Sequence, residues 1–221
     1  MWVGSCLKES DQLGNWGGMT VSTRATSHGE AGAGLSHSSR YFRFVGADRG
    51  DWKVLSQRTI IGEALPEVPG LTVLTPTSPQ TDPAHWMLSG VTSNERYVER
   101  DEKAALVSRQ ESLGRPAATR AALIPIRKNA AWWALSQDER RRIFEADSRH
   151  IAIGLQALPA IARRLHHCRD LPTSEPFDFL TWFEYAPQDE PIFDTLLRDL
   201  RATREWTYVD WEVELRLVRE V

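Results

Sequence analysis

The order of the segments that follow residue 120 restricts the possible folds of this chain more than any other feature. "AALIPIRK" (121–128) predicts a strand, and a capping-box pattern at Ser136–Glu139 begins a helix that should run to about Leu158. Two strands joined by a hairpin loop come next: "AIARRLHHC" and "PFDFLTWFEY". An amphipathic helix, "DEPIFDTLLRDLRATREW", and an alternating strand, "VDWEVELRLVR", complete the series. The order β-α-β-β-α-β predicts an α+β, ferredoxin-like arrangement.

Alternation assigns one apolar face to each of these elements, and we expect the apolar strand faces to pack against the two helices. The expected inward residues are Phe177, Phe179, Thr181 and Phe183 of the hairpin, Ile192, Phe193, Leu196, Leu197 and Leu200 of the second helix, and Val209, Trp211, Val213, Leu215 and Leu217 of the last strand. Pro125 interrupts the first strand of the series, which suggests an edge position or a bulge there because proline has no N–H to donate.

The segment 41–118 has the features of a reduced copy of the same arrangement. "RYFRFVGAD", "LTVLTPTS" and "AHWMLSGVTSNERYV" predict strands, and "DEKAALVSRQESLG" predicts a helix with Gly114 as its C-cap. "RGDWKVLSQ" stands where the first helix of the copy would lie, so we expect a shortened helix there. We therefore predict a ferredoxin-like repeat with a reduced N-terminal half (41–118) and a complete second half (119–221).

Residues 1–40 differ from the rest of the chain. They hold seven of its 14 glycines and show no hydrophobic period, so they cannot bury enough surface to offset the entropy of ordering. We expect a disordered tail or a misassigned start, with Met19 as an alternative initiator. The net charge of −3 gives no indication of a nucleic-acid partner, and no apolar run is long enough to span a bilayer. The two cysteines show no zinc-site spacing, and a cytoplasmic protein is expected.

His150 lies inside the predicted long helix. Gly154 and Ala157 follow one and two turns later on the same face, which leaves room for a flat, bulky ligand beside the imidazole. The ordinary alternative is a core histidine whose nitrogens are satisfied by the protein.

Arg163 is predicted to point to the same strand face as two apolar residues, Ile161 and Leu165. An arginine in such surroundings is costly unless it is paired or binds an anion. His166 and His167 lie on opposite faces of that strand, so they cannot both bind one metal ion, and we expect structural roles for both.

Several long stretches closely resemble chlorite dismutases of the short, dimeric group. They are "GVTSNERYV", "SLGRPAATRAALIPIRK", "ALIPIRKNAAWWALSQDERRRIFEADSRHIAIGLQALPAIARRLHHCRDL", "FDFLTWFEYAP" and "LRATREWTYVDWEVELRLVR". The resemblance extends from about Tyr41 to Arg219. It implies a homodimer of the dimeric α+β barrel type that holds heme b. It also implies an enzyme, a chlorite O2-lyase, that converts chlorite to chloride and dioxygen with formation of an O–O bond.

The resemblance also implies roles for individual residues. His150 maps to the ligand of the heme iron, Arg163 to the catalytic arginine on the substrate side, and Glu205 to the acid that accepts a hydrogen bond from the imidazole. Matches to heme-contacting residues are Lys128, Trp132, Trp133, Asn94 and Tyr97. Three of these assignments have a purely structural alternative: Lys128 as a surface lysine, the two tryptophans as core residues, and Glu205 as a surface acid at a helix end.

Two other functions stay open at this point. A coproheme decarboxylase of heme synthesis would share the fold and use the porphyrin as its substrate, and a heme carrier or sensor would have no reaction at all. Arg163 argues against both, because that decarboxylase family lacks the arginine and a carrier has no need for a guanidinium beside an open iron site. Chlorite is a small anion that a permanently charged guanidinium attracts and orients.

Overall fold

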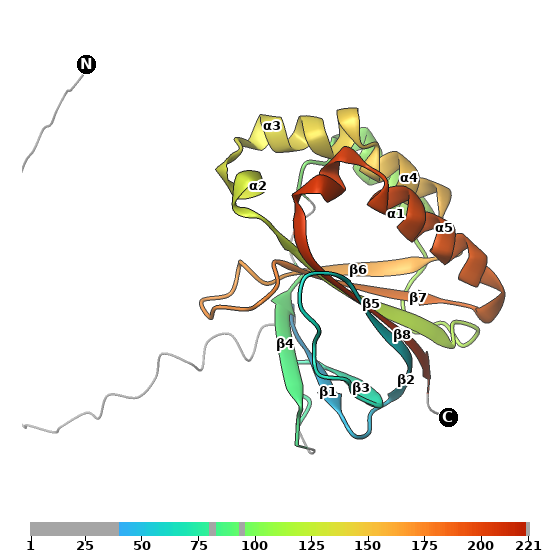
Figure 1. The fold of residues 1–221 in the computed structure, drawn as a ribbon. Helices are drawn as coiled ribbons and strands as arrows, with labels where there is room; N and C mark the ends of the chain where they lie inside the picture. Colours follow the sequence, from blue (N-terminus) through green and yellow to red (C-terminus); the bar gives the residue numbers. More distant parts are fainter. Residues whose placement is uncertain (1–39, 80–82, 93–95, 220–221) are drawn as a thin grey trace, which may run out of the picture. The chain divides into compact units, whose positions relative to one another are not determined.

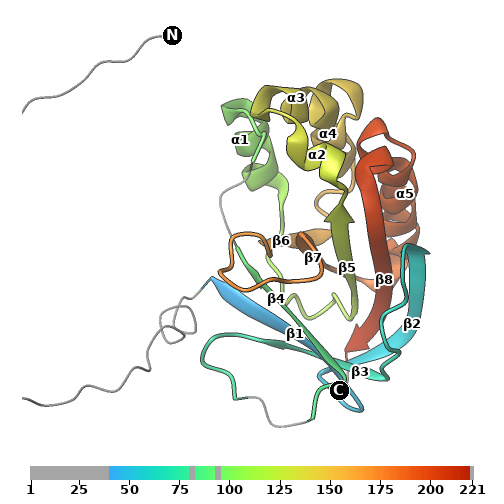
Figure 2. The ribbon, with the colours of Figure 1, turned by 60° about the vertical axis from the view of Figure 1, so that its left-hand side comes forward.

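The computed structural model describes residues 40–79, 83–92 and 96–219 (Figures 1 and 2). The expected tail therefore lies outside the described residues, apart from Arg40, and Asn94 also lies outside them. The strands are β1 Tyr41–Ala47, β2 Trp52–Ile61, β3 Gly70–Leu74, β4 Trp86–Val91, β5 Arg120–Lys128, β6 Ala162–His167, β7 Phe179–Tyr185 and β8 Val209–Arg219. The α-helices are α1 Arg100–Arg109, α2 Ala130–Ala134, α3 Gln137–Arg141, α4 His150–Gln156 and α5 Glu190–Arg201. A π-helical segment spans Arg142–Asp147, and 3-10 turns span Pro187–Asp189 and Arg204–Tyr208.

The eight strands form a closed antiparallel barrel in the order β1-β3-β2-β8-β5-β7-β6-β4. Within this ring the first four strands follow the order β4-β1-β3-β2, and the last four repeat it as β8-β5-β7-β6. β2 and β8 join the two sets from Trp52↔Arg219 to Ile61↔Glu212, whereas β4 and β6 share the single pair Val91↔His167. The labelled helices all lie on one side of β5–β8 (Figure 1). The fold is thus α+β, as predicted.

Two hydrophobic cores lie on opposite faces of the second set of strands. One fills the barrel and includes Phe44, Leu123 and Leu215. The other lies between the outer face of the sheet and α5 and includes Phe183 and Phe193. Each such side chain contributes about 1.5–3 kcal/mol when it is fully buried, so the outer core holds α5 firmly against the sheet.

Strands are present within the segments predicted at 40–48, 71–78 and 84–98 as β1, β3 and β4, but β3 ends at Leu74 and β4 at Val91, earlier than predicted. The short helix predicted at 49–57 is wrong, because this segment enters β2 and pairs with β8. The predicted helix of this half is α1, but it ends at Arg109 with Gln110 as its C-cap. Gly114 instead lies in the following loop with φ 81°, and its N–H donates to Glu184 Oε2 at 2.6 Å.

Pro125 does not mark a sheet edge, because β5 lies between β7 and β8. The ladder with β8 contains Leu123↔Leu215 and Ile126↔Glu212 but no pair at Ile124 or Pro125. The proline thus occupies a gap in one ladder, where its missing N–H is not needed. The only register shift between β5 and β8 falls later, between Arg127 and Lys128.

The long helix predicted from Ser136 begins as expected and then breaks. The capping box is present, with Ser136 N donating to Glu139 Oε2 at 2.8 Å. α3 then passes into the π-helical segment, and Arg149 adopts a left-handed conformation, with φ 54°, before α4 begins at His150. A left-handed conformation is uncommon for a residue other than glycine, and at Arg149 it interrupts the helix between the π-helical segment and α4.

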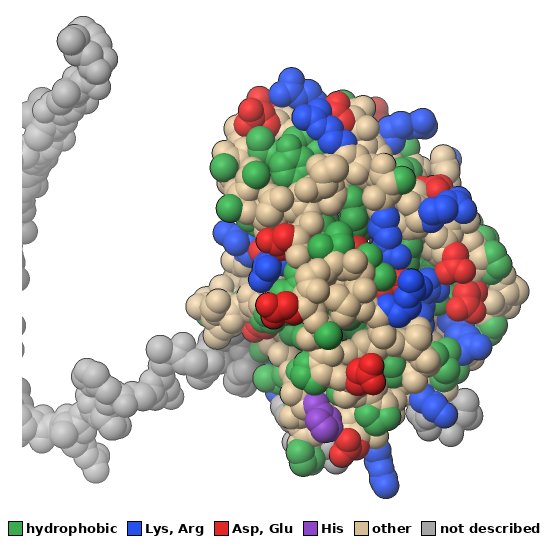
Figure 3. All heavy atoms as spheres, in the orientation of Figure 1, with side chains coloured by type: hydrophobic (Ala, Val, Ile, Leu, Met, Phe, Trp, Pro, Cys, Tyr) green, Lys and Arg blue, Asp and Glu red, His purple; other side chains and the backbone are tan. Residues whose placement is uncertain are grey.

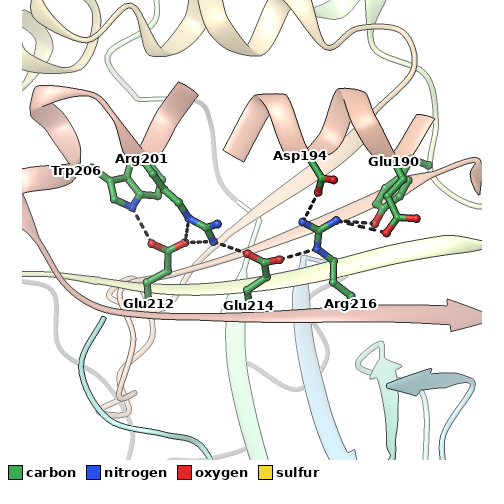
Figure 4. A network of polar contacts seen from close by, with 8 residues as sticks. Glu190, Asp194, Arg201, Trp206, Glu212, Glu214 and Arg216 are labelled. Carbon is green, nitrogen blue, oxygen red and sulfur yellow. Dashed lines mark hydrogen bonds and ion pairs between the residues drawn. The ribbon is translucent and has the colours of Figure 1, made fainter. Parts of the chain in front are cut away.

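The last strand and last helix differ in part from the predicted faces. Val213, Leu215 and Leu217 are fully buried, but they fill the barrel and do not face the helices. The opposite face of β8 carries Glu212 and Glu214, which are also buried and lie under α5 (Figure 4). Trp211 is only partly buried, and Phe177 belongs to the barrel core. Ile192 is 39% exposed, because the buried face of α5 consists of Phe193, Leu196, Leu197 and Leu200.

Basic and acidic side chains are interspersed over the face of the molecule that Figure 3 shows. Within the described part of the chain, no helix is long and apolar enough to cross a membrane.

Candidate active site

A cavity of about 300 Å³ lies between the outer face of β5, β6 and β7 and the helices α2, α4 and α5. Apolar side chains from the strands and from α5 form much of its wall, among them Ile124, Phe183 and Leu197. The polar residues that share this wall include His150, Arg163, Lys128 and Glu205. Side chains from distant parts of the sequence thus meet in one pocket, which is the usual form of a ligand or cofactor site.

His150 begins α4, and its imidazole is held from two directions. Nδ1 lies 2.7 Å from Glu205 Oε2, and the ring stacks on Phe144 with a centroid distance of 4.2 Å and an interplanar angle of 22°. Phe144 belongs to the π-helical segment, so the break in the long helix places it against the imidazole. When Nδ1–H donates a hydrogen bond to the carboxylate, Nε2 carries the lone pair that can bind a metal.

Glu205 is buried, with 4% of its surface exposed, and both its carboxylate oxygens and its backbone N–H and carbonyl have hydrogen-bond partners. Oε1 accepts a hydrogen bond from Lys128 Nζ at 2.9 Å, and the backbone N–H donates to Ser148 Oγ at 2.9 Å. Burial alone would raise the pKa of Glu205, but its interactions with His150 and Lys128, including their hydrogen bonds, outweigh it and hold this pKa well below its usual value. The carboxylate is therefore ionised and can polarise the imidazole.

Lys128 forms a buried ion pair with this carboxylate. Nζ also donates to the carbonyl oxygen of Glu205 at 3.2 Å, and it lies 4.8 Å from the ring centroid of Trp132 and 5.3 Å from that of Trp206. The ammonium group thus sits between two indole faces, where cation–π attraction offsets part of its desolvation.

The helix face that carries His150 continues along the cavity, as the sequence indicates. Gly154 and Ala157 line the same pocket, and a Cβ atom placed on Gly154 would have no atom within 4 Å apart from its own helix and neighbours. The glycine therefore leaves open space next to the imidazole.

Arg163 enters the same cavity from β6. Leu165 and His167 of the same strand, and Ile161 just before it, also line the pocket. Arg164 is a lining residue too, but its guanidinium lies 5.0 Å from the ring centroid of Phe42, on the side where His166 contacts Phe42, which agrees with the predicted alternation. The backbone carbonyl of Arg163 accepts a hydrogen bond from Gln110 Nε2 at 3.0 Å. Gln110 is a cavity residue that the sequence analysis missed, because a glutamine after a polar helix carries no pattern of its own.

His166 and His167 point to opposite sides of β6, as predicted. His166 lies inside the barrel between the rings of Phe42 and Phe44, each at a centroid distance of 5.0 Å, with Nδ1 3.0 Å from the carbonyl oxygen of Leu180. His167 faces the cavity. Burial lowers the pKa of each imidazole to about 4.

The two tryptophans of α2 differ in their hydrogen bonds. Trp133 Nε1 donates to Asp178 Oδ2 at 3.2 Å, whereas Trp132 Nε1 is buried in the cavity wall without a hydrogen-bond partner. Tyr97 also lines the cavity, with φ 63°, and its backbone carbonyl accepts a hydrogen bond from Arg141.

Among the described residues, no cluster of three or more His, Cys, Asp or Glu side chains could hold a metal ion. A heme, in contrast, supplies four nitrogen ligands to its iron, so one axial side chain from the protein, such as an imidazole, can hold it. The open space at Gly154, the apolar walls and the orientation of His150 by Glu205 fit such a group.

Comparison with known proteins agrees with this geometry. A scan against models of protein families finds no match. The structure of a dimeric chlorite dismutase from Nitrobacter winogradskyi superposes with a TM-score of 0.75 and is 56% identical in sequence, over 81% of this chain and 99% of that one. The chain belongs to the chlorite dismutase family.

Two more distant members of the chlorite dismutase family also match. A variant of the enzyme from Candidatus Nitrospira defluvii is 28% identical, with a TM-score of 0.51, over 61% of this chain and 55% of that one. The curated chlorite dismutase of Ideonella dechloratans is 30% identical over 132 residues. That match covers 56% of this chain and 42% of the curated relative, so the chain spans less than half the length of that protein.

Proposed function

We propose that this protein is a heme b-dependent chlorite dismutase that converts chlorite to chloride and dioxygen. One observation carries the proposal: an imidazole oriented by a buried, ionised carboxylate shares an apolar cavity with an arginine from another element. His150 and Glu205 supply the first part and Arg163 the second. The family to which the chain belongs supports the same reaction.

Each cavity residue would have a definite part in this reaction. His150 Nε2 would bind the iron, and Glu205, itself held by Lys128, would raise the basicity of the imidazole and fix its orientation. Trp132, Trp133 and Tyr97 line the cavity and would contact the heme, and the unpartnered Nε1 of Trp132 could donate to an oxygen of this group. Asn94 keeps its proposed place at the heme propionates from the sequence match alone.

A bound heme would supply the redox chemistry of the site. The part of the protein is then to admit the substrate, orient it and retain its fragments. The Arg163 guanidinium would attract chlorite and hold the anionic fragment left after the first oxygen transfer, until the O–O bond forms and chloride leaves. The apolar wall of the cavity strengthens this attraction, because charges interact more strongly where water is excluded.

The remaining features of the proposal concern the fold, assembly and location. The two halves, 41–118 and 119–221, repeat one strand order, which supports their origin as two ferredoxin-like units. The similarity to a dimeric relative supports a homodimer. Cys168 is a buried free thiol, which is compatible with a reducing, cytoplasmic location.

The decisive experiment loads the purified chain with hemin and adds chlorite at an oxygen electrode. Oxygen should appear with chloride in equal amounts, and Arg163→Ala should evolve it more slowly than the parent. A parallel incubation with coproheme tests for decarboxylation by mass spectrometry. Decarboxylation without oxygen release would replace the proposal with a heme-synthesis enzyme, and hemin binding without either reaction would indicate a carrier.

A further inference from the structure

A network of charged side chains lies between β8 and α5, next to the cavity (Figure 4). Glu212 and Glu214 point from β8 toward α5, with 0% and 2% of their surfaces exposed. Arg201, from the last turn of α5, donates to both: Nη2 lies 2.6 Å from Glu212 Oε1 and 2.6 Å from Glu214 Oε2. Arg216 Nε continues the network at 2.7 Å from Glu214 Oε1. Two buried carboxylates are thus matched by two guanidinium groups.

One contact connects this network to the cavity. Trp206 Nε1 donates a hydrogen bond to Glu212 Oε2 at 2.7 Å. Trp206 directly follows Glu205 in the 3-10 turn Arg204–Tyr208, and its ring both lines the cavity and faces Lys128 Nζ. A hydrogen bond to a charged acceptor is about twice as strong as one between neutral groups. The indole is therefore held firmly at its N–H by a group outside the cavity.

We propose that Glu212 is a positioning residue for the His150–Glu205 pair and acts through Trp206. The role at the iron rests on the proposed function, whereas the effect on the imidazole does not require heme. Glu212 fixes the edge of the indole, and the indole face in turn contacts the Lys128 ammonium that bonds Glu205. If the indole shifts, the Lys128 ammonium loses its contact with the Trp206 ring and keeps only that with Trp132. The backbone of Glu205, which directly precedes Trp206, is then held less firmly. The contact between Glu205 Oε2 and His150 Nδ1, now 2.7 Å, then weakens.

The negative charge of Glu212 adds an electrostatic effect to this geometry. A carboxylate that accepts the indole N–H makes the ring more electron-rich, which strengthens its attraction for the Lys128 ammonium. The sequence of contacts is therefore Glu212 to Trp206, Trp206 to Lys128, and Lys128 to Glu205. Groups that orient a ligand from the outer shell affect metal affinity by about 10–100-fold when they contact the ligand directly. A more remote residue should act at the lower end of this range.

The test compares three variants of the full-length chain. Glu212→Gln removes the charge, and Trp206→Phe removes the indole N–H while it keeps an aromatic ring. Glu214→Gln is the matched control, because Glu214 is equally buried on the same strand and shares Arg201, but its hydrogen bonds go to arginines and none to Trp206. Three quantities are measured: the imidazole nitrogen shifts of His150 in the apo-protein at fixed pH, the Kd for hemin, and the ferric/ferrous midpoint potential of the loaded protein.

Glu212→Gln and Trp206→Phe should move the His150 nitrogen signals and weaken hemin binding about tenfold. They should also raise the midpoint potential, because a less basic imidazole favours ferrous iron, by up to about 59 mV for a tenfold change in relative affinity. Glu214→Gln should change none of the three, although it lowers the unfolding midpoint.

If Glu214→Gln shifts the His150 signals as much as Glu212→Gln does, or if none of the variants shifts them, Glu212 contributes only to stability and the inference is wrong. Should Glu212→Gln fail to fold, Trp206→Phe decides the question by the same signals. If the parent binds no hemin, the proposed function fails, whereas the apo-protein signals still decide the role of Glu212.

Discussion

Removal of the Arg201 side chain should destabilise the protein strongly, because this arginine neutralises two carboxylates in the interior. In Arg201→Met, Glu212 keeps only the Trp206 N–H and Glu214 keeps Arg216. Breaking a buried pair by removing one partner costs about 3–5 kcal/mol, since the remaining charge stays buried without compensation. For a chain of this size, 1 kcal/mol corresponds to roughly 2–4 °C, so the melting temperature should fall by about 6–20 °C.

Urea unfolding of the apo-protein at neutral pH, followed by circular dichroism, measures the change in the free energy of unfolding, and a thermal scan measures the fall in melting temperature. The double variant Arg201→Met/Glu212→Gln should regain part of the loss, because it removes the charge that has been left alone. Arg198→Met serves as the control: Arg198 is exposed and pairs with Asp199 of the same helix, and such surface pairs contribute less than about 1 kcal/mol. An Arg201→Met variant within about 1 kcal/mol of the parent would show that solvent or another cation compensates the two carboxylates, and the magnitude argued from Figure 4 would be wrong.

Three further predictions concern the cavity and the two buried histidines. His150→Ala should abolish stable hemin binding, seen as loss of the Soret band, whereas His166→Ala should keep it; the opposite pattern would contradict the ligand assignment. Arg163→Ala should still bind hemin, but chlorite turnover should fall by up to about 10²-fold and the heme should bleach sooner, with Arg163→Lys in between; equal oxygen yields and lifetimes for Ala and parent would exclude the substrate role. Burial lowers the pKa of His166 and His167 in the folded state to about 4, so the unfolded chain binds these protons first as the pH falls. Stability should therefore decrease between about pH 6.5 and pH 4, on the order of 3 kcal/mol for each histidine, and His166→Gln should reduce that slope in urea titrations at stepped pH.

The strands of the second half were predictable because apolar alternation survives in single segments. "AIARRLHHC" placed Arg163 and His167 on one face of β6, and both line the cavity. The helix face of His150 and Gly154 was predictable for the same reason, since side chains about four residues apart share a face. The capping box at Ser136 likewise identified the start of α3.

The features that failed depend on contacts between distant segments. The segment 49–57 forms a strand because β8 is available to pair with it, and barrel closure cannot be deduced from local propensity. The π-helical segment and the left-handed Arg149 divide a stretch whose pattern is that of one continuous helix. Gln110 reaches Arg163 across 53 positions of sequence, so no local pattern connects the two.

The acids of β8 show most clearly how a regular pattern can hide a site. In "VDWEVELRLVR" the alternation of apolar and charged residues predicts one buried and one solvated face, yet Glu212 and Glu214 are buried. Two buried carboxylates are tolerated because α5 brings Arg201 over them, Arg216 pairs with Glu214 and Trp206 donates its N–H to Glu212. The same turn that supplies Trp206 supplies Glu205 to His150. Glu212, which the amphipathic pattern assigns to the surface, therefore contacts the turn that orients the proposed iron ligand. The proposed role of Glu212 thus links the stability of the α5–β8 layer to the geometry of the cavity.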